Sequence, residues 1–245
     1  LTLNSKGSTS AVLVDTAAPT LTITTDDTAL IAGETATITF TFSEVPVGFA
    51  WDGSSGDVTV GGGTLSAIAA TGDAKVFTAV LTPTANSTTA ATVTVASGSY
   101  TDAAGNTGGA GAMPATTVNT VVPGAPVLTT STSSISSTTP TLTGTAPANA
   151  TVKIYNGTTL INTVTADGPG AWTLNITSGQ LAEGANVITT TATDSSGNVS
   201  PSSSAITLTL DTAAPSAPSI TGGAGTSNDA TPTFAGTAEP NSTVE

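Results

Sequence analysis

The sequence contains no cysteine and no histidine. Their absence excludes thiolate nucleophiles, imidazole bases and zinc sites built from Cys and His. Lysine and arginine together number three against 16 acidic residues, which gives a formal net charge of −13. The basic footprint of a nucleic-acid-binding protein is therefore missing as well. The surplus of carboxylates suits a hydrated surface or a hard cation such as calcium.

Aromatic residues make up only 4% of the chain, although 38% of it is hydrophobic. The cores must therefore be built mainly from Val, Ile, Leu, Ala and the methyl groups of Thr. Thr, Val and Ile favour strands, and the frequent Gly, Pro, Asn and Asp favour turns, so we expect an all-β protein. No apolar run reaches the length of a membrane span, and the first ten residues lack the regions of a signal peptide. We expect no membrane insertion and an export signal outside this sequence.

An internal repeat is the strongest signal in the chain. The segment that begins at Val121 aligns without gaps with the segment that begins at Ala213, an offset of 213 − 121 = 92 residues. Within it, TPTLTGTAPANATV becomes TPTFAGTAEPNSTV. Repeats of this length are typical of tandem arrays of small domains.

Two short motifs recur in fixed phase with this repeat. DTAAP stands at residues 15–19 and 211–215, and NTVVP stands between them at residues 119–123. A loop of the form D-x-x-G-N begins at Asp102 and again at Asp194, each 17 residues before the next boundary (119 − 102 and 211 − 194). We predict the last strand of a preceding module at 1–14, complete modules at 15–118 and 119–210, and the start of a further module at 211–245.

The 92-residue module predicts seven short strands separated by turn signals. Asn156-Gly157 is a strong signal for a two-residue hairpin, and Trp172 alternates with Leu174 and Ile176 on what we expect to be a buried face. Such a pattern is typical of a β-sandwich of the immunoglobulin or fibronectin III kind. The predicted strands are 126–130, 139–146, 150–156, 158–165, 171–177, 186–193 and 204–210.

The longer module has the same ends. We predict strands in 33–43, 75–83 and 91–100, whereas the extra residues 48–66 leave the strand order open. A lone Trp is more often a packing residue than a platform for a sugar, and this interpretation applies to Trp172 and also to Trp51, which precedes a turn.

The sandwich topology predicts where the acidic residues gather. Because successive strands alternate in direction, the loop between the last two strands lies beside the start of its own module, together with two other loops. Two junction clusters follow, and the preceding module's first turn faces the second of them. The predicted residues are Asp15, Asp73, Asp102 and Asn106 in the first module, Asn119, Asp167, Asp194 and Asn198 in the second, Asp26 and Asp27 from the preceding turn, and Asp211 at the third start.

Gathered carboxylates call for a counter-charge. Two carboxylates about 4 Å apart repel by roughly 4 kcal/mol at an effective dielectric constant near 20. Calcium removes this cost and takes six to eight oxygen ligands, whereas magnesium prefers a tight octahedron with several waters. We therefore predict structural Ca²⁺ at the module junctions. The alternative is that each D-x-x-G-N loop is simply a turn whose Asp accepts backbone N–H bonds.

The DTAAP starts, the TPTLTGTAPANATV-like strands and the D-x-x-G-N loops resemble the bacterial Ig-like repeats of giant surface adhesins. The first module, with GETATITFTFSE and SGSYTDAAGN, resembles a second subfamily of these repeats. The resemblance implies rods exported by type I secretion, stiffened by calcium, that hold a binding domain away from the cell. It places junction ligands at Asp15, Asp211, Asp102 and Asp194, while Asn119 departs from the Asp of the pattern.

We thus expect a structural spacer of an extracellular adhesin, in contact with neighbouring modules of its own chain. Host-cell, bacterial or abiotic surfaces would be bound through other domains. A subunit of a surface layer or filament is the alternative, and long apolar lateral patches and ordered partial modules would favour it. A carbohydrate-binding module would need exposed aromatic residues in one groove. An enzyme is the least favoured, because the pairs Asp26/Asp27 and Asp52/Asp57 stand in turns without a pocket signature.

Overall fold

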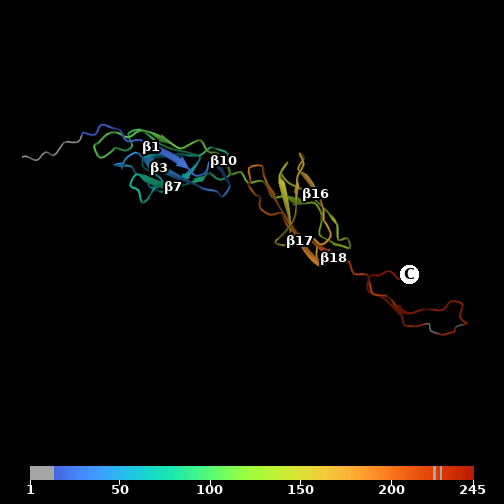
Figure 1. Ribbon diagram of the computed structural model, residues 1–245. Helices are drawn as coiled ribbons and strands as arrows, with labels where there is room; N and C mark the ends of the chain where they lie inside the picture. Colours follow the sequence, from blue (N-terminus) through green and yellow to red (C-terminus); the bar gives the residue numbers. More distant parts are fainter. Residues whose placement is uncertain (1–13, 223–224, 227) are drawn as a thin grey trace, which may run out of the picture.

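The computed structural model describes residues 14–222, 225–226 and 228–245, and every regular element in this part of the chain is a β-strand. Two β-sandwiches follow one another end to end, and a β-hairpin lies beyond them (Figure 1). The strand predicted at 1–14 lies outside the described residues except for Val14. None of the described segments forms a helix with the length and hydropathy of a membrane span.

The first sandwich has one larger sheet with the strand order β1-β3-β7-β5, and β6 pairs with β7 as well. β3 carries the sequence ATITFTF, whose alternate residues are buried and exposed, as expected for a strand with one face on a core. These strands are β1 (Leu21–Thr25), β3 (Ala36–Phe42), β5 (Gly63–Leu65), β6 (Ala69–Ala70) and β7 (Val76–Pro83).

The facing sheet has the order β4-β8-β9, and a short parallel pair, β2 with β10, ties the start of the module to its end. These strands are β2 (Ala29–Ile31), β4 (Val58–Gly61), β8 (Thr92–Val95), β9 (Gly111–Ala112) and β10 (Thr117–Asn119). β4 and β5 fall in the extra residues of this module, which the sequence pattern left unassigned. β4 pairs with β8, and β5 pairs with β7, so these residues add one strand to each sheet.

The core of the first module holds most of the aromatic residues of the chain. Phe42 contacts Phe49, Phe77 and Tyr100 in edge-on arrangements, with ring centroids 4.9 to 5.9 Å apart. The Tyr100 hydroxyl donates a hydrogen bond to the carbonyl of Pro19 at 3.3 Å and so fastens the module start to this core. Trp51 is half-buried and packs against the same cluster.

The second sandwich has a three-stranded sheet, β11-β13-β16, facing a five-stranded sheet, β12-β18-β17-β14-β15. The predicted strands of this module are confirmed, most of them within two residues of their expected ends. The observed strands are β11 (Val127–Leu128), β12 (Ser133–Ile135), β13 (Thr141–Thr145), β14 (Thr151–Asn156), β15 (Thr159–Thr165), β16 (Ala171–Asn175), β17 (Gly184–Thr193) and β18 (Ile206–Leu210).

Two details of the second module differ from the sequence prediction. β12 was not predicted; it pairs in parallel with β18, as β2 pairs with β10 in the first module. The hairpin turn is centred on Gly157 and Thr158 rather than on Asn156-Gly157, because Asn156 already pairs with Thr159. A register shift between Ile154 and Tyr155 accompanies this displacement.

Trp172 is a core residue, as predicted, with 3% of its surface exposed. Its ring lies over Gly144 of the neighbouring strand β13, where an added Cβ would come within 2.4 Å of the ring. A glycine is therefore required beneath the indole. The two module cores share no residue among the described parts of the chain.

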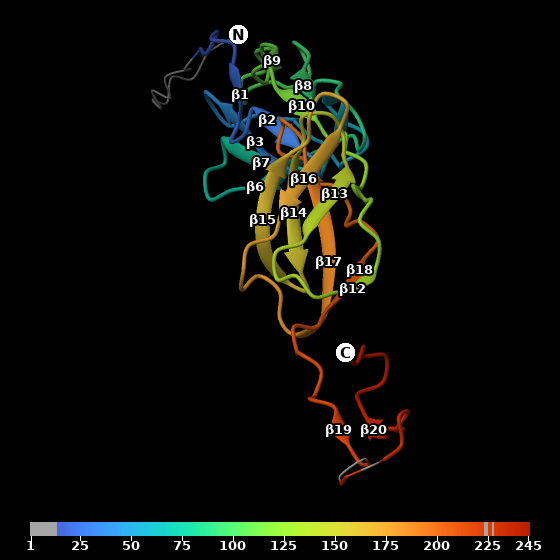
Figure 2. The same cartoon turned by 90° about the vertical axis from the view of Figure 1, so that its right-hand side faces the viewer.

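The hairpin beyond the second module consists of β19 (Ser219–Ile220) and β20 (Gly236–Thr237) (Figure 2). Its pairing, Ser219 with Thr237 and Ile220 with Gly236, repeats that of β11 and β13 at an offset of 92 residues (219 − 127). The sequence repeat is thus also a repeat of strand register. Phe234 is 64% exposed here, whereas the equivalent Leu142 (234 − 92) is fully buried in the second module.

Candidate cation site and module junction

The two D-x-x-G-N loops have the same hydrogen bonds. In the first module, Asp102 Oδ1 accepts the backbone N–H of Asn106 at 2.8 Å, and its Oδ2 accepts the Asn106 side-chain amide at 2.7 Å. In the second, Asp194 accepts the same two bonds from Asn198 at 2.9 and 3.0 Å. The loop is therefore a closed turn, as the alternative interpretation predicted, and each Asp fixes the side chain of its Asn.

Each Asn in turn holds the start of its own module. Asn106 Nδ2 donates to the carbonyl of Asp15 at 3.1 Å, and Asn198 Nδ2 donates to the carbonyl of Asn119 at 3.0 Å. The prediction that these loops lie beside the module starts is confirmed by these bonds. The starts share a turn of their own, in which Asp15, Asn119 and Asp211 each accept the backbone N–H two residues ahead.

Three carboxylates converge at the start of the first module. One oxygen each from Asp15, Glu44 and Asp102 lies within 4.8 Å of the other two. Asp102 is almost completely buried, Glu44 is half-buried and Asp15 is exposed. Because a buried carboxylate is strongly disfavoured beside others without compensation, this cluster is the strongest candidate cation site in the described part of the chain.

The pKa values at this cluster move in opposite directions. Burial raises the pKa of Glu44, and the neighbouring Asp102 and Asp15 raise it further. Burial also acts to raise the pKa of Asp102, but hydrogen bonds from the Asn106 side chain and from the backbone N–H groups of the loop outweigh it and leave this pKa lowered. The hydrogen bonds of its loop therefore favour the ionised form of Asp102. The repulsion from Asp102 and Asp15 acts on Glu44 and favours its protonated form.

The donor set fits calcium better than other common metals. It consists of carboxylate oxygens, which calcium prefers, and no cysteine or histidine exists in the chain to favour zinc. Asp102 accepts hydrogen bonds on both oxygens, yet each carboxylate oxygen has a second lone pair available. A bound cation would also relieve the repulsion that raises the pKa of Glu44.

Sequence analysis missed Glu44. A usable signal exists, because Glu44 follows β3, and β3 ends beside the start of β1 through the pair Leu21–Phe42. A carboxylate just after this strand must therefore lie at the same end of the module as Asp15.

Five predicted ligands have other partners and do not join a carboxylate cluster among the described residues. Each accepts a backbone N–H within its own module, which is the behaviour of a turn residue. The acceptor and donor pairs are Asp26 with Thr37, Asp27 with Ala29, Asp73 with Lys75, Asp167 with Ala171, and Asp211 with Ala213.

The direct hydrogen bonds at the junction between the two complete modules are made by amides rather than carboxylates. Asn198 is 1% exposed, and its Oδ1 accepts the backbone N–H of Ala32 in the first module at 2.8 Å. Asn119 Nδ2 donates to the Ser196 hydroxyl at 2.7 Å. Asp194 contributes a single carboxylate here, and its pKa is lowered because bonds from Asn198, Ser196 and Gly197 outweigh the effect of burial.

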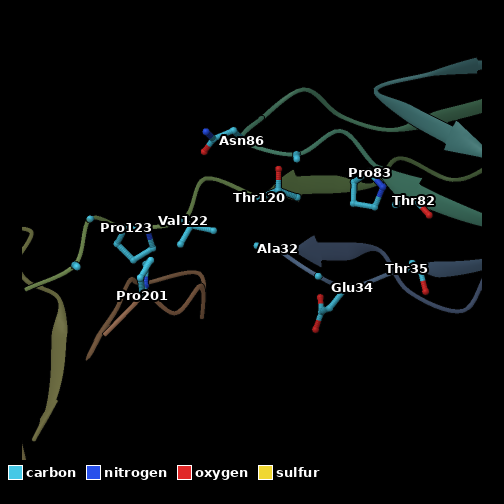
Figure 3. Close-up of a pocket in the computed structure, with 14 residues that line it drawn as sticks. Ala32, Glu34, Thr35, Thr82, Pro83, Asn86, Thr120, Val122, Pro123 and Pro201 are labelled. Atoms are coloured by element: carbon cyan, nitrogen blue, oxygen red, sulfur yellow. The ribbon is translucent and has the colours of Figure 1, made fainter. Parts of the chain in front are cut away.

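Beside these contacts lies an open groove of about 600 Å³ between the modules (Figure 3). The first module contributes the turn around Ala32 and Glu34 together with Pro83 and Asn86, and the second contributes Pro201. The linker runs along it with Val122 and Pro123 (Figure 3). The modules therefore touch on one side of the junction and leave space on the other.

Comparison with solved structures gives distant similarities. The fibronectin(III)-like modules of Clostridium thermocellum CbhA are 17% identical with a TM-score of 0.39, covering 77% of this chain and 93% of theirs. A biofilm-associated protein domain is 16% identical with a TM-score of 0.31, and the match covers 79% of this chain but only 30% of that one. A tetra-tandem repeat from the extending region of a large adhesion protein is 16% identical with a TM-score of 0.32, covering 83% and 52%.

Comparison with curated protein sequences gives no significant match. Two family models match, both described as bacterial Ig-like domains, one over residues 15–122 and the other over residues 129–212. Domains of this kind are structural modules and not enzymes, in agreement with the expectation from the sequence. Together the two matches span most of the chain, which therefore belongs to the bacterial Ig-like domains and carries two of them in tandem.

Proposed function

We propose that this chain is a spacer segment of a bacterial surface adhesin, exposed outside the cell, and that it carries a binding domain away from the surface. The observation that carries the proposal is the end-to-end arrangement of two Ig-like domains with a hydrogen bond across their junction (Figure 1). Each module is roughly 40 Å long, given strands of six to eight residues and their loops. With stiff junctions, the end-to-end length of the array grows in proportion to the number of modules. With flexible junctions, it grows only as the square root of that number.

The surface of the chain suits this role. The net charge of −13 disfavours self-association, and no apolar groove with several exposed aromatic residues occurs in the described ranges, where Trp172 is buried and Trp51 is half-buried. The apolar residues exposed on the last hairpin, such as Phe234, occupy core positions by the 92-residue repeat. They do not form the lateral patch that a surface-layer subunit would need.

The spacer role is tested with the purified 245-residue protein. Small-angle scattering should give an elongated particle, and fluorescently labelled protein should show no saturable binding to glycan arrays, host cells or bacterial cells. Saturable binding that survives excess unlabelled control protein of the same charge would replace the spacer with a recognition domain. A compact, folded-back particle would contradict the rod.

We further propose that calcium binds to the cluster of Asp15, Glu44 and Asp102. The site joins the module start, the end of β3 and the loop that holds Asn106, so an ion there fastens three separate segments. Extracellular calcium modules bind with dissociation constants of about 10⁻⁴–10⁻³ M, so the site would fill outside the cell and stay empty in the cytoplasm.

Calorimetric titration and residue-resolved NMR of the whole chain test this site. Calcium should bind in the stated range and shift the amide signals around Asp15, Glu44 and Asp102. Glu44→Gln should abolish most of this binding. Asp73→Asn is the matched control, because Asp73 lies outside the cluster and should have no effect. Equal effects of both changes, or no calcium binding at all, would leave the D-x-x-G-N loops as turns only.

A further inference from the structure

We infer that the junction between the two modules is held by Asn198 as a latch that needs no metal ion. The sequence pattern predicts calcium here as at the first cluster. In the described part of the chain, Asp194 belongs to no group of three carboxylates that could hold a cation, and both of its oxygens accept hydrogen bonds from Asn198. Glu34, which lines the groove beside it, accepts the backbone N–H of Ile31 in its own turn. The direct hydrogen bond that crosses to the first module joins the Asn198 side-chain oxygen to the backbone N–H of Ala32.

The orientation of the Asn198 amide follows from its neighbours. Two acceptors, the Asp194 carboxylate and the carbonyl of Asn119, face one end of the group, so this end must be the NH₂. The backbone N–H of Ala32 faces the other end, which must be the oxygen. An ionised Asp can only accept, so Asp194 holds the amide in the one orientation that receives Ala32. Asp194 is thus a positioning residue for the latch.

The burial of Asn198 makes its hydrogen bond to Ala32 important for the stability of the junction. Asn198 is 1% exposed, and an unpaired polar group at such a place is costly, so the Ala32 bond is favoured over an open junction. The Ile31 side chain also approaches Gly197 of the same loop, to 3.4 Å of the position that a Cβ would take there. Without the latch, the linker remains and the open groove gives the second module room to swing (Figure 3).

Asn106 in the first module provides an internal comparison. It makes the same bonds to its Asp and to its module start, but no contact with another module is present in the described part of the chain. Asn106→Ala therefore removes the contribution of the amide within a module. Asn198→Ala removes that contribution and the latch as well.

Ala32→Pro removes the donor by a change confined to the first module. Ala32 occupies the second position of a four-residue turn from Ile31 to Glu34, and the third position, Gly33, has a φ of +85°. This is the geometry of a type II turn, in which proline is favoured at the second position. The substitution deletes the N–H that Asn198 accepts and leaves the second module unchanged, so a loss of the latch can be separated from a loss of folding.

Pulsed electron paramagnetic resonance measures the outcome, since the absence of cysteine permits specific labelling at Thr59→Cys and Thr173→Cys, both exposed. The parent protein should give one narrow distance distribution that is the same in calcium and in chelator. Ala32→Pro and Asn198→Ala should broaden it, and Asn106→Ala should not. Broadening of the parent by chelator, or a narrow distribution in Ala32→Pro, would overturn the inference. Both of these outcomes are independent of the calcium titration of the parent protein and Glu44→Gln.

Discussion

At the residue scale, the conserved geometry of the two D-x-x-G-N loops shows how one motif serves two purposes. Asp102 and Asp194 hold their Asn side chains through nearly the same pair of bonds. The surroundings then differ, because Glu44 and Asp15 approach Asp102, while Asn119 stands at the second junction. Two differences therefore separate a carboxylate cluster from an amide contact: Asn replaces Asp at the second module start, and no counterpart of Glu44 joins Asp194 among the described residues.

Substitution of Trp172 tests the contribution of a single core residue to the stability of the second module. Trp172→Ala should destabilise the second module by about 3–5 kcal/mol, because it deletes a buried large aromatic side chain over a glycine that cannot fill the space. Denaturant unfolding measures the change in the free energy of unfolding, and calorimetry measures the melting temperature. Thr173→Ala, on the exposed face of the same strand, is the control. An unchanged melting temperature would contradict a core role.

Acidification in the presence of a chelator tests the charged side chains at the two D-x-x-G-N loops. Because the folded-state pKa of Asp194 is lowered, the stability that it provides is present above the usual Asp pKa and is lost as the pH falls through the lowered value. The first module should behave differently. Its Glu44 has a raised pKa, so protonation just above the usual Glu range should first stabilise this module, before Asp102 protonates and the stability falls.

Melting temperatures measured against pH resolve the two modules. Glu44→Gln should remove the initial rise in the first module and leave the second module's curve in place. A monotonic loss of stability in both modules of the parent protein would mean that Glu44 is not under repulsion.

At the element scale, the hairpin of β14 and β15 shows that turn chemistry fixed the existence of the turn but not its centre. Gly157 has a φ of +58°, which an L side chain adopts only at a cost, and Thr158 follows it. Asn156 is drawn into strand pairing, and its side-chain amide donates to Asn186 at 2.8 Å. A buried partner on another strand therefore decided the register, which local turn preference could not do.

Gly157→Ala should destabilise the second module by about 1 kcal/mol, because alanine resists the positive φ although nothing lies within 4 Å of its added Cβ. Gly168→Ala is the matched control, with equal space and no positive φ, and should change the stability by less than about 0.5 kcal/mol. Chemical denaturation of both variants checks this pair. Equal effects would mean that the Gly157 turn is not strained by a side chain.

At the scale of the whole molecule, the two separate cores predict two unfolding transitions. Trp172→Ala should lower the temperature of one transition and leave the other within experimental error, since the two core clusters share no residue in the described chain. Differential scanning calorimetry of the full chain is the measurement. A single transition that shifts as a whole would mean that the junction couples the modules more strongly than their cores separate them.

Much of the fold could be predicted from the sequence, because period-two alternation, as at Trp172, Leu174 and Ile176, is a local property that tertiary packing preserved. The phase of the D-x-x-G-N loops likewise placed Asp102 beside Asp15. The Asn198 contact with Ala32 could not be predicted, because it depends on the angle between two modules, and no local pattern encodes that angle. Glu44, by contrast, could have been placed from the sequence, because it follows a strand that runs back to the module start.

The parallel pairing of the second and last strands in each module has a mechanical consequence. β2 pairs with β10, and β12 pairs with β18, so each module's entering and leaving segments lie side by side and run the same way. A pull on the two ends of the chain draws these paired strands in opposite directions along their length. The hydrogen bonds between them are then loaded together in shear instead of breaking one after another. Tension applied along the array would thus meet its greatest resistance at the second and last strands of each module.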